Sequence, residues 1–153
     1  MTTPDFQVAA VRRLLWPDKD AHLKRIAYSA SEAADVFGVP VRKVWALLDA
    51  GQIRAPRTGR RYFLPGGTIL DVLGVKEHPD INDHRDPAVF EVGRIYTRAN
   101  RAVLFGTSNR VIRSLAESGR LEESEAIGSA RYATGTDVLR FLDRVDEPLR
   151  KSA

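Results

Sequence analysis

Two short stretches in the first half of the chain place hydrophobic residues at helical spacing, and a glycine follows each of them. Ser31 is a good N-cap for a helix over residues 32–37, because its hydroxyl can accept a hydrogen bond from a backbone N–H of the first turn. Gly38 can end this helix in the left-handed conformation that glycine tolerates. The next hydrophobic stretch indicates a second helix over residues 41–50, which Gly51 closes. The pattern therefore predicts two helices joined by a tight turn.

The pattern changes after the second helix. Residues 53–64 predict a β-hairpin with its tip near Thr58. A proline and two glycines then interrupt regular structure, and Thr68 can cap a last short helix over residues 69–73. Helix, turn, helix, hairpin and helix follow one another in the winged helix-turn-helix fold, so the first half of the chain is expected to adopt it.

The same pattern occurs a second time later in the chain. Residues 28–51 align with residues 96–119 without a gap, and 7 of the 24 positions are identical. We interpret this as two copies of one module. Two copies are too few for a solenoid, so each is expected to carry its own small core. The expected fold class is mainly α with small β-hairpin wings, built as two tandem winged helix-turn-helix modules.

Composition along the chain indicates where these modules begin and end. The stretch between them carries five acidic and two basic residues, so we interpret it as a solvated linker. A hydrophobic stripe over residues 5–15 predicts an amphipathic helix, which either packs on the first module or contacts a partner protein or a second copy. The predicted segments are an N-terminal helix and lead-in (1–27), the first module (28–74), an acidic linker (75–93), the second module with a divergent wing (94–145) and a tail (146–153).

The second helix of the first module has one hydrophobic and one polar face. At ~100° per residue, Val44 and Leu48 share the hydrophobic side, whereas Arg42, Lys43 and Ala46 point away from it. An arginine early in such a helix can bind guanine through two hydrogen bonds, and a small residue lets the helix sit deep in a major groove. These three residues are therefore candidate DNA contacts, although Arg42 would also suit an ordinary solvated surface.

The predicted hairpin of the first module is strongly basic. Arg54, Arg57, Arg60 and Arg61 lie within eight residues, and Thr58 stands at the turn between them. A run of charges is usually only a solvated face, but this one falls where a wing would touch DNA. We expect these residues to lie along phosphates or to enter a minor groove.

The second module repeats the helix but not the basic hairpin. Arg110 and Ser114 occupy the positions of its exposed helical face and are further candidate DNA contacts. Its hairpin has three carboxylates in the first strand, Glu122, Glu123 and Glu125, and only Arg131 offers a cation opposite them. Carboxylates repel a phosphate backbone. The second module therefore binds DNA through its helices, or it is a protein-contact module, and both readings stay open.

Composition excludes several other classes of function. The chain of 153 residues has no cysteine, and its three histidines lack metal-ligand spacing, so neither a metal nor another cofactor is expected. No phosphate-binding loop or nucleophile motif is present, and an enzyme is disfavoured. The formal net charge of +4 favours polyanionic partners. Without a signal peptide or membrane-spanning run, we expect a cytoplasmic, nucleoid-associated protein with no membrane contact.

Several of these stretches together resemble a known family, the excisionase-type winged helix-turn-helix, which is a branch of the MerR-like DNA-binding domains. The resemblance covers residues 28–73 well and 96–143 loosely. In the second copy, Ala99-Asn100-Arg101 replaces the usual Ser-Glu-Ala start, and the wing lacks its Gly-Arg-Arg. The matching stretches are Tyr-Ser-Ala-Ser-Glu-Ala-Ala at 28–34, Gly-Val-Pro-Val-Arg-Lys-Val at 38–44, Gly-Gln-Ile at 51–53 and Gly-Arg-Arg-Tyr at 59–62.

The resemblance implies that the second helix and the wing contact DNA. This expected DNA contact applies to five residues of the first copy and, in the second copy, to Arg110 and Arg131. Members of the family act as recombination directionality factors, as transcription regulators, or as DNA-recognition parts of phage packaging machinery. The first-copy residues to which it applies are Arg42, Lys43, Arg57, Arg60 and Arg61.

The residues and the resemblance together lead to one main functional hypothesis. The chain is expected to be a non-catalytic, sequence-specific protein that binds double-stranded DNA, as an excisionase-like recombination directionality factor or a small transcription regulator. The alternative is an adaptor, in which the first module binds DNA and the second recruits a recombinase, a polymerase or a phage packaging subunit. A homo-oligomer on DNA stays open.

Overall fold

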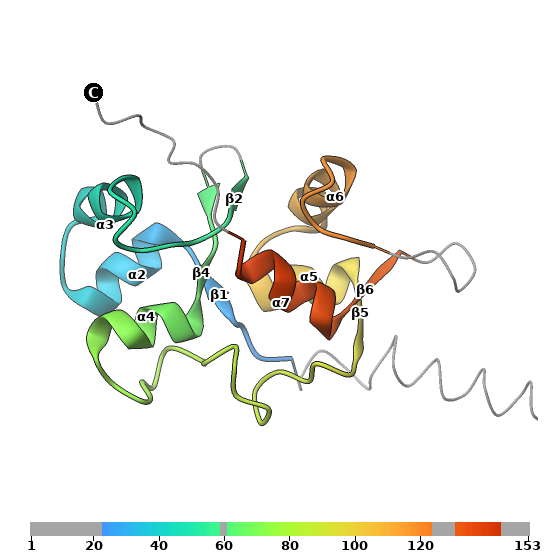
Figure 1. The fold of residues 1–153 in the computed structure, drawn as a ribbon, viewed down its shortest axis with the longest axis horizontal. Helices are drawn as coiled ribbons and strands as arrows, with labels where there is room; N and C mark the ends of the chain where they lie inside the picture. The colour runs from blue at the N-terminus through green and yellow to red at the C-terminus, as the bar shows by residue number, and fades with distance from the viewer. Residues whose placement is uncertain (1–22, 59–60, 124–130, 145–153) are drawn as a thin grey trace, which may run out of the picture.

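In the computed structural model, residues 23–58, 61–123 and 131–144 are described, and they form mainly α-helices with small antiparallel strand pairs (Figure 1). The first repeat comprises β1 (Ala27–Tyr28), α2 (Ala30–Phe37), α3 (Val41–Asp49), β2 (Arg57–Thr58), β3 (Arg61–Tyr62), β4 (Leu64–Pro65) and α4 (Gly66–Leu73). The second repeat comprises β5 (Ile95–Thr97), α5 (Arg98–Phe105), α6 (Asn109–Glu117), β6 (Tyr132–Thr134) and α7 (Gly135–Leu142). The expectation of a mainly α chain with small β pairs is confirmed.

The two repeats share the order strand, helix, helix, strand, helix and a pairing scheme, and within the described residues the first repeat has the β2–β3 pair in addition. In each, the first strand pairs antiparallel with the strand that precedes the last helix, β1 with β4 and β5 with β6. The register places Tyr28 opposite Leu64, and Tyr96 opposite Ala133. In each repeat the chain therefore returns to its starting strand before it forms the last helix.

The first helix of the first repeat begins two residues earlier than a cap at Ser31 predicts. Ser29 is the N-cap of α2, and its hydroxyl accepts a hydrogen bond of 3.1 Å from the Glu32 N–H. The Glu32 carboxylate in turn accepts one of 2.9 Å from the Ser29 N–H. Thr97 and Asn100 form the same reciprocal pair in α5. This capping box satisfies two backbone donors at once, which a cap at Ser31 would not do.

The last helix of the first repeat also begins earlier than predicted. α4 starts at Gly66 with Pro65 as its N-cap, so Thr68 lies inside the helix and does not cap it. Gly66 serves close packing here, because a Cβ at this position would lie 1.7 Å from the Asn82 carbonyl oxygen. The sequence pattern predicts that this glycine interrupts regular structure. In the fold it begins α4 instead and lets the segment after the helix pass close against it.

The alignment led us to expect one hydrophobic core in each repeat, and the structure differs from this expectation. One core lies within the first repeat and its following segment, but the other combines second-repeat residues with Ile26, Ala27 and Phe63. The Phe63 ring lies 5.8 Å from that of Phe105 and 5.9 Å from that of Phe141, measured between centroids. The first repeat therefore inserts an aromatic side chain into the core of the second.

The segment over residues 75–93, expected to be a solvated linker, is anchored to both repeats. Ile81, His84 and Phe90 are buried. The Phe90 ring stacks on Tyr96 with centroids 5.1 Å apart, and His84 Nδ1 accepts a hydrogen bond of 3.1 Å from the Gly67 N–H. Most of its carboxylates remain exposed, as the charge pattern predicts. The predicted N-terminal helix and the tail after residue 144 lie outside the described residues.

Candidate nucleic-acid interface

The exposed face of α3 carries the three candidates that the helical pattern places there. Val44 and Leu48 are 0% and 4% exposed, and they anchor the helix on the first core. Arg42, Lys43 and Ala46 are exposed. Because Ala46 is small and follows two cations, this face has positive charge at its start and little bulk at its centre.

The β2–β3 strand pair carries the next group of candidate arginines. Arg54 precedes it and is exposed, and Arg57 pairs opposite Tyr62 across the two strands. The exposed Arg61 donates a hydrogen bond of 2.7 Å from Nη1 to the Thr107 hydroxyl of the second repeat. Thr58 lies in β2, opposite Arg61. Arg60 lies outside the described residues.

The corresponding helix of the second repeat is α6. Ile112 and Leu115 are fully buried, whereas Arg110 and Ser114 are exposed as predicted. Arg113, also exposed, forms an ion pair of 2.9 Å with Glu117 one turn later. Arg110 and Ser114 therefore repeat the arrangement of the outward-facing candidates on α3.

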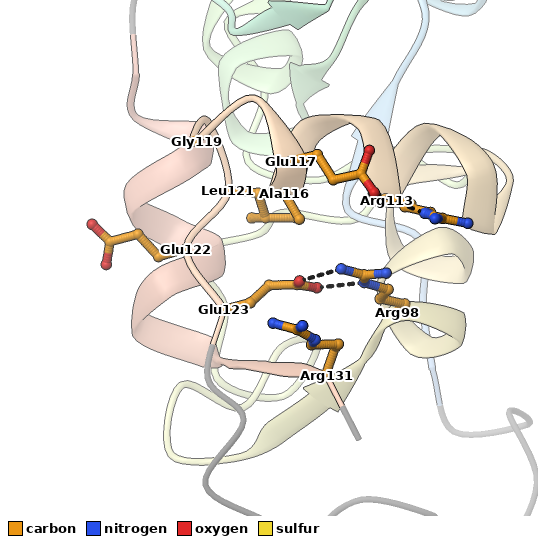
Figure 2. A pocket seen from close by; sticks show the side chains of 9 residues that line it. All are labelled: Arg98, Arg113, Ala116, Glu117, Gly119, Leu121, Glu122, Glu123 and Arg131. Carbon is orange, nitrogen blue, oxygen red and sulfur yellow. Dashed lines mark hydrogen bonds and ion pairs between the residues drawn. The ribbon is translucent and has the colours of Figure 1, made fainter. Parts of the chain in front are cut away.

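In the acidic stretch after α6, the two carboxylates that the structure describes are paired with arginines of the second repeat. Glu123 points inward, with its side chain 7% exposed, and accepts hydrogen bonds from two arginines of α5, of which Figure 2 shows Arg98. Arg98 contacts it at 2.6 and 2.9 Å, and the fully buried Arg101 contacts it at 2.6 Å. Glu122 is exposed and bonds to Arg140 of α7 at 2.9 Å. Glu125 lies outside the described residues.

The two arginines keep the Glu123 carboxylate ionised. Burial raises the pKa of Glu123, but hydrogen bonds from Arg98 and Arg101 outweigh it, so the pKa lies below its usual value. The same contacts raise the pKa of Arg98. This negative charge is therefore neutralised inside the second repeat, and the sequence alone did not reveal its partners. The available signal was the arginine pair on α5, where the first repeat has alanines.

Arg131 lies beside the C-terminal half of α6, apart from the candidates of the first repeat. It lines a cavity of about 440 Å³ together with Arg98 and Arg113, and three glutamates line the same cavity (Figure 2). Opposite charges are thus balanced around it, so an anion gains little there. In Figure 1 the strand that follows Arg131, β6, lies on the far side of the molecule from α3.

The remaining candidates gather along one side of the molecule. In Figure 1, α3, the β2–β3 pair and α6 all lie along the upper edge, with the strand pair between the two helices. We call residues 41–58, 61–62 and 109–117 the basic edge. The segment over residues 75–93, with its exposed carboxylates, lies along the lower edge. The candidate cations and the exposed carboxylates of this segment therefore lie on opposite edges, whereas the exposed Glu117 and Glu122 lie at the end of α6 and just after it.

No family model, curated protein or solved structure matches this chain. What the basic edge can do is therefore inferred from its own residues. Within residues 23–58, 61–123 and 131–144, no helix is long and apolar enough to cross a membrane. Nor does that part of the chain gather three or more histidines or carboxylates in a position to hold a metal ion.

Proposed function

We propose that this chain is a non-catalytic protein that binds double-stranded DNA in a sequence-dependent way, as a pair of winged helix-turn-helix modules. Its cellular role would be that of an excisionase-like recombination directionality factor or a small transcription regulator. The observation that carries the proposal is the exposed face of α3, with Arg42 and Lys43 in its first turn, beside a strand pair rich in arginine.

The two parts of this surface would have different tasks. Arg42 is positioned to read base edges from a helix in the major groove, since an arginine can make two hydrogen bonds to guanine. Arg54, Arg57 and Arg61 would contact phosphates, which position the protein but read little sequence. The order helix, turn, helix and strand pair supports this division, because it is the order in winged helix-turn-helix domains.

The structure weakens the sequence argument for the adaptor alternative. It rested on the acidic stretch of the second repeat, whose Glu122 and Glu123 both have partners within that repeat. A carboxylate paired internally offers less charge to a partner protein. Recruitment of a recombinase, polymerase or packaging subunit therefore stays as an outcome of the test rather than the main proposal.

Selection from a random duplex library tests the proposal directly. The purified chain is incubated with the library at ~0.15 M salt, and the bound fraction is sequenced. We expect an enriched motif and an affinity that falls steeply with salt, with a log–log slope of about −4 to −6 for roughly four to seven phosphate contacts. Retention without enrichment would contradict sequence-dependent binding. No retention would contradict DNA binding in the main proposal and in the adaptor alike, and would leave only protein recruitment by the second repeat.

A further inference from the structure

The β2–β3 pair of the first repeat is attached to the second repeat on both of its strands. From β3, Arg61 donates its hydrogen bond to Thr107, which lies in the turn before α6. At β2, the Arg57 carbonyl accepts a hydrogen bond from Arg120, which follows α6. The strand pair is thus held at both ends of α6 and lies between the two exposed helices (Figure 1).

The shared core prevents the two repeats from moving independently. Phe63, next to β3, is 2% exposed and packs among second-repeat aromatic rings. The Ile26 N–H, just before β1, donates a hydrogen bond of 2.8 Å to the Leu104 carbonyl of α5. Close-packed cores resist small displacements. The distance and angle between α3 and α6 are therefore set by the fold.

Charge along the basic edge is compatible with one polyanion in contact with all of it. Its two helices and strand pair present Arg42, Lys43, Arg61 and Arg110 as exposed side chains. Near α6, Glu123 points into the protein, and the exposed Glu117 and Glu122 form ion pairs with Arg113 and Arg140, which lowers their repulsion of a phosphate backbone. Exposed carboxylates of the segment over residues 75–93 lie on the opposite edge, where they would repel a duplex that approached that edge.

We infer that α3, the β2–β3 pair and α6 form one rigid surface that binds a single stretch of double-stranded DNA at two base-reading positions with invariant spacing. This inference rests on the proposed function and adds to it that both repeats read the same duplex together. A chain with a flexible linker would instead accept two sites at variable separation. The structure favours the rigid arrangement because three separate contacts join the strand pair and Phe63 to the second repeat.

The first test compares two exposed cations of the full-length chain. Arg110→Ala removes a charge from α6 on the basic edge, and Lys76→Ala removes an exposed charge from the opposite edge. Against the selected duplex, Arg110→Ala should weaken binding roughly 5- to 150-fold and relax base preference in one half of the site. Lys76→Ala should leave affinity and preference nearly unchanged. Circular dichroism spectra of both variants confirm folding.

The second test changes the spacing within the selected site. Five inserted base pairs turn the two halves to opposite faces of the duplex, and about ten restore the face but displace one half by ~34 Å. A rigid surface should lose affinity with both insertions, to the level of a single half-site. Recovery with the ten-base-pair insertion would overturn the fixed spacing.

The outcomes separate this inference from the proposed function. If Arg110→Ala behaves like Lys76→Ala while Arg42→Ala still weakens binding, the first repeat binds DNA alone and the composite surface is overturned. In that case the proposed function stands. If the wild-type chain retains no duplex at all, the proposed function itself fails, whatever the spacing results.

Discussion

At the scale of single residues, a buried ion pair in the second repeat replaces a pair of alanines in the first. Arg101 and Glu123 align with Ala33 and Ala55, which are 0% and 4% exposed. One charge alone at either place would be buried without a partner, which is strongly destabilising. The two differences therefore depend on each other. A helical wheel cannot reveal this, because the partners come from different elements.

Glu123→Ala should destabilise the chain strongly, because it leaves the Arg101 guanidinium buried without its carboxylate. We expect a loss of about 3 kcal/mol or more in the free energy of unfolding, measured by urea denaturation. The matched control is Glu122→Ala at the neighbouring position, where an exposed ion pair with Arg140 contributes about 0–1 kcal/mol. Equal losses for the two variants would contradict the buried pair. The double variant with Arg101→Ala, which recreates the first-repeat residues, should recover part of the loss.

At the scale of elements, the signals that proved reliable were local ones. Gly38 and Gly51 were expected to end helices, and they have left-handed φ values of 70° and 73°. A helix stop depends on the few residues around it, so a single sequence can reveal it. The choice between Ser29 and Ser31 as the cap depended on the reciprocal bond from Glu32, a feature the helical spacing does not contain.

The segment over residues 75–93 is attached to α4 through a histidine. His84 is 6% exposed, and its Nδ1 accepts the hydrogen bond from the Gly67 N–H. Burial lowers the pKa of His84, although the carboxylate of Asp83, with Oδ1 3.8 Å from Nδ1, acts in the opposite direction. The folded state therefore favours the neutral imidazole, which alone can accept this bond.

Stability should consequently depend on pH in a defined window. The unfolded chain binds a proton at His84 near the ordinary pKa of about 6.5, whereas the folded chain binds it only at lower pH. The contribution of His84 is thus complete above about pH 6.5 and is lost as pH falls from there through the folded pKa. Urea denaturation at a series of pH values between about 5 and 7.5 measures this.

His84→Asn provides the control for this pH dependence. The asparagine carbonyl oxygen can accept the bond from Gly67 but does not titrate. We expect the variant to lose the decrease in stability that the wild-type chain shows as pH falls below about 6.5. An unchanged slope in the variant would mean that another group is responsible.

At the scale of the whole molecule, the sequence predicted the repeat but not how the copies join. Phe63 stands in a run of three hydrophobic residues over 62–64, which is typical of a buried segment but does not say in which core the ring lies. The ring lies among Phe105 and Phe141 of the second repeat. The outward faces of α3 and α6 follow from helical periodicity alone, whereas their common edge depends on this long-range packing. A fragment that ends at residue 80 would expose Phe63 and is expected to fold poorly.

Phe63→Ala should destabilise both repeats together. The loss of a buried phenylalanine costs about 3–5 kcal/mol, and its contacts lie on α5 and α7. Hydrogen exchange measured on peptides should show lower protection in α7 as well as in β4. Leu70→Ala, in the first core only, should affect α7 less. If Phe63→Ala left α7 unchanged, the repeats would not share a core.

The most direct measurement compares the affinities of Arg42→Ala and Lys76→Ala for the duplex selected by the wild-type chain. Both variants remove one exposed positive charge, so the net charge changes equally, and only the position differs. DNA binding through the basic edge predicts a loss of roughly 5- to 150-fold for Arg42→Ala, with relaxed base preference, and little change for Lys76→Ala. Equal affinities for the two variants would contradict DNA recognition by the exposed face of α3.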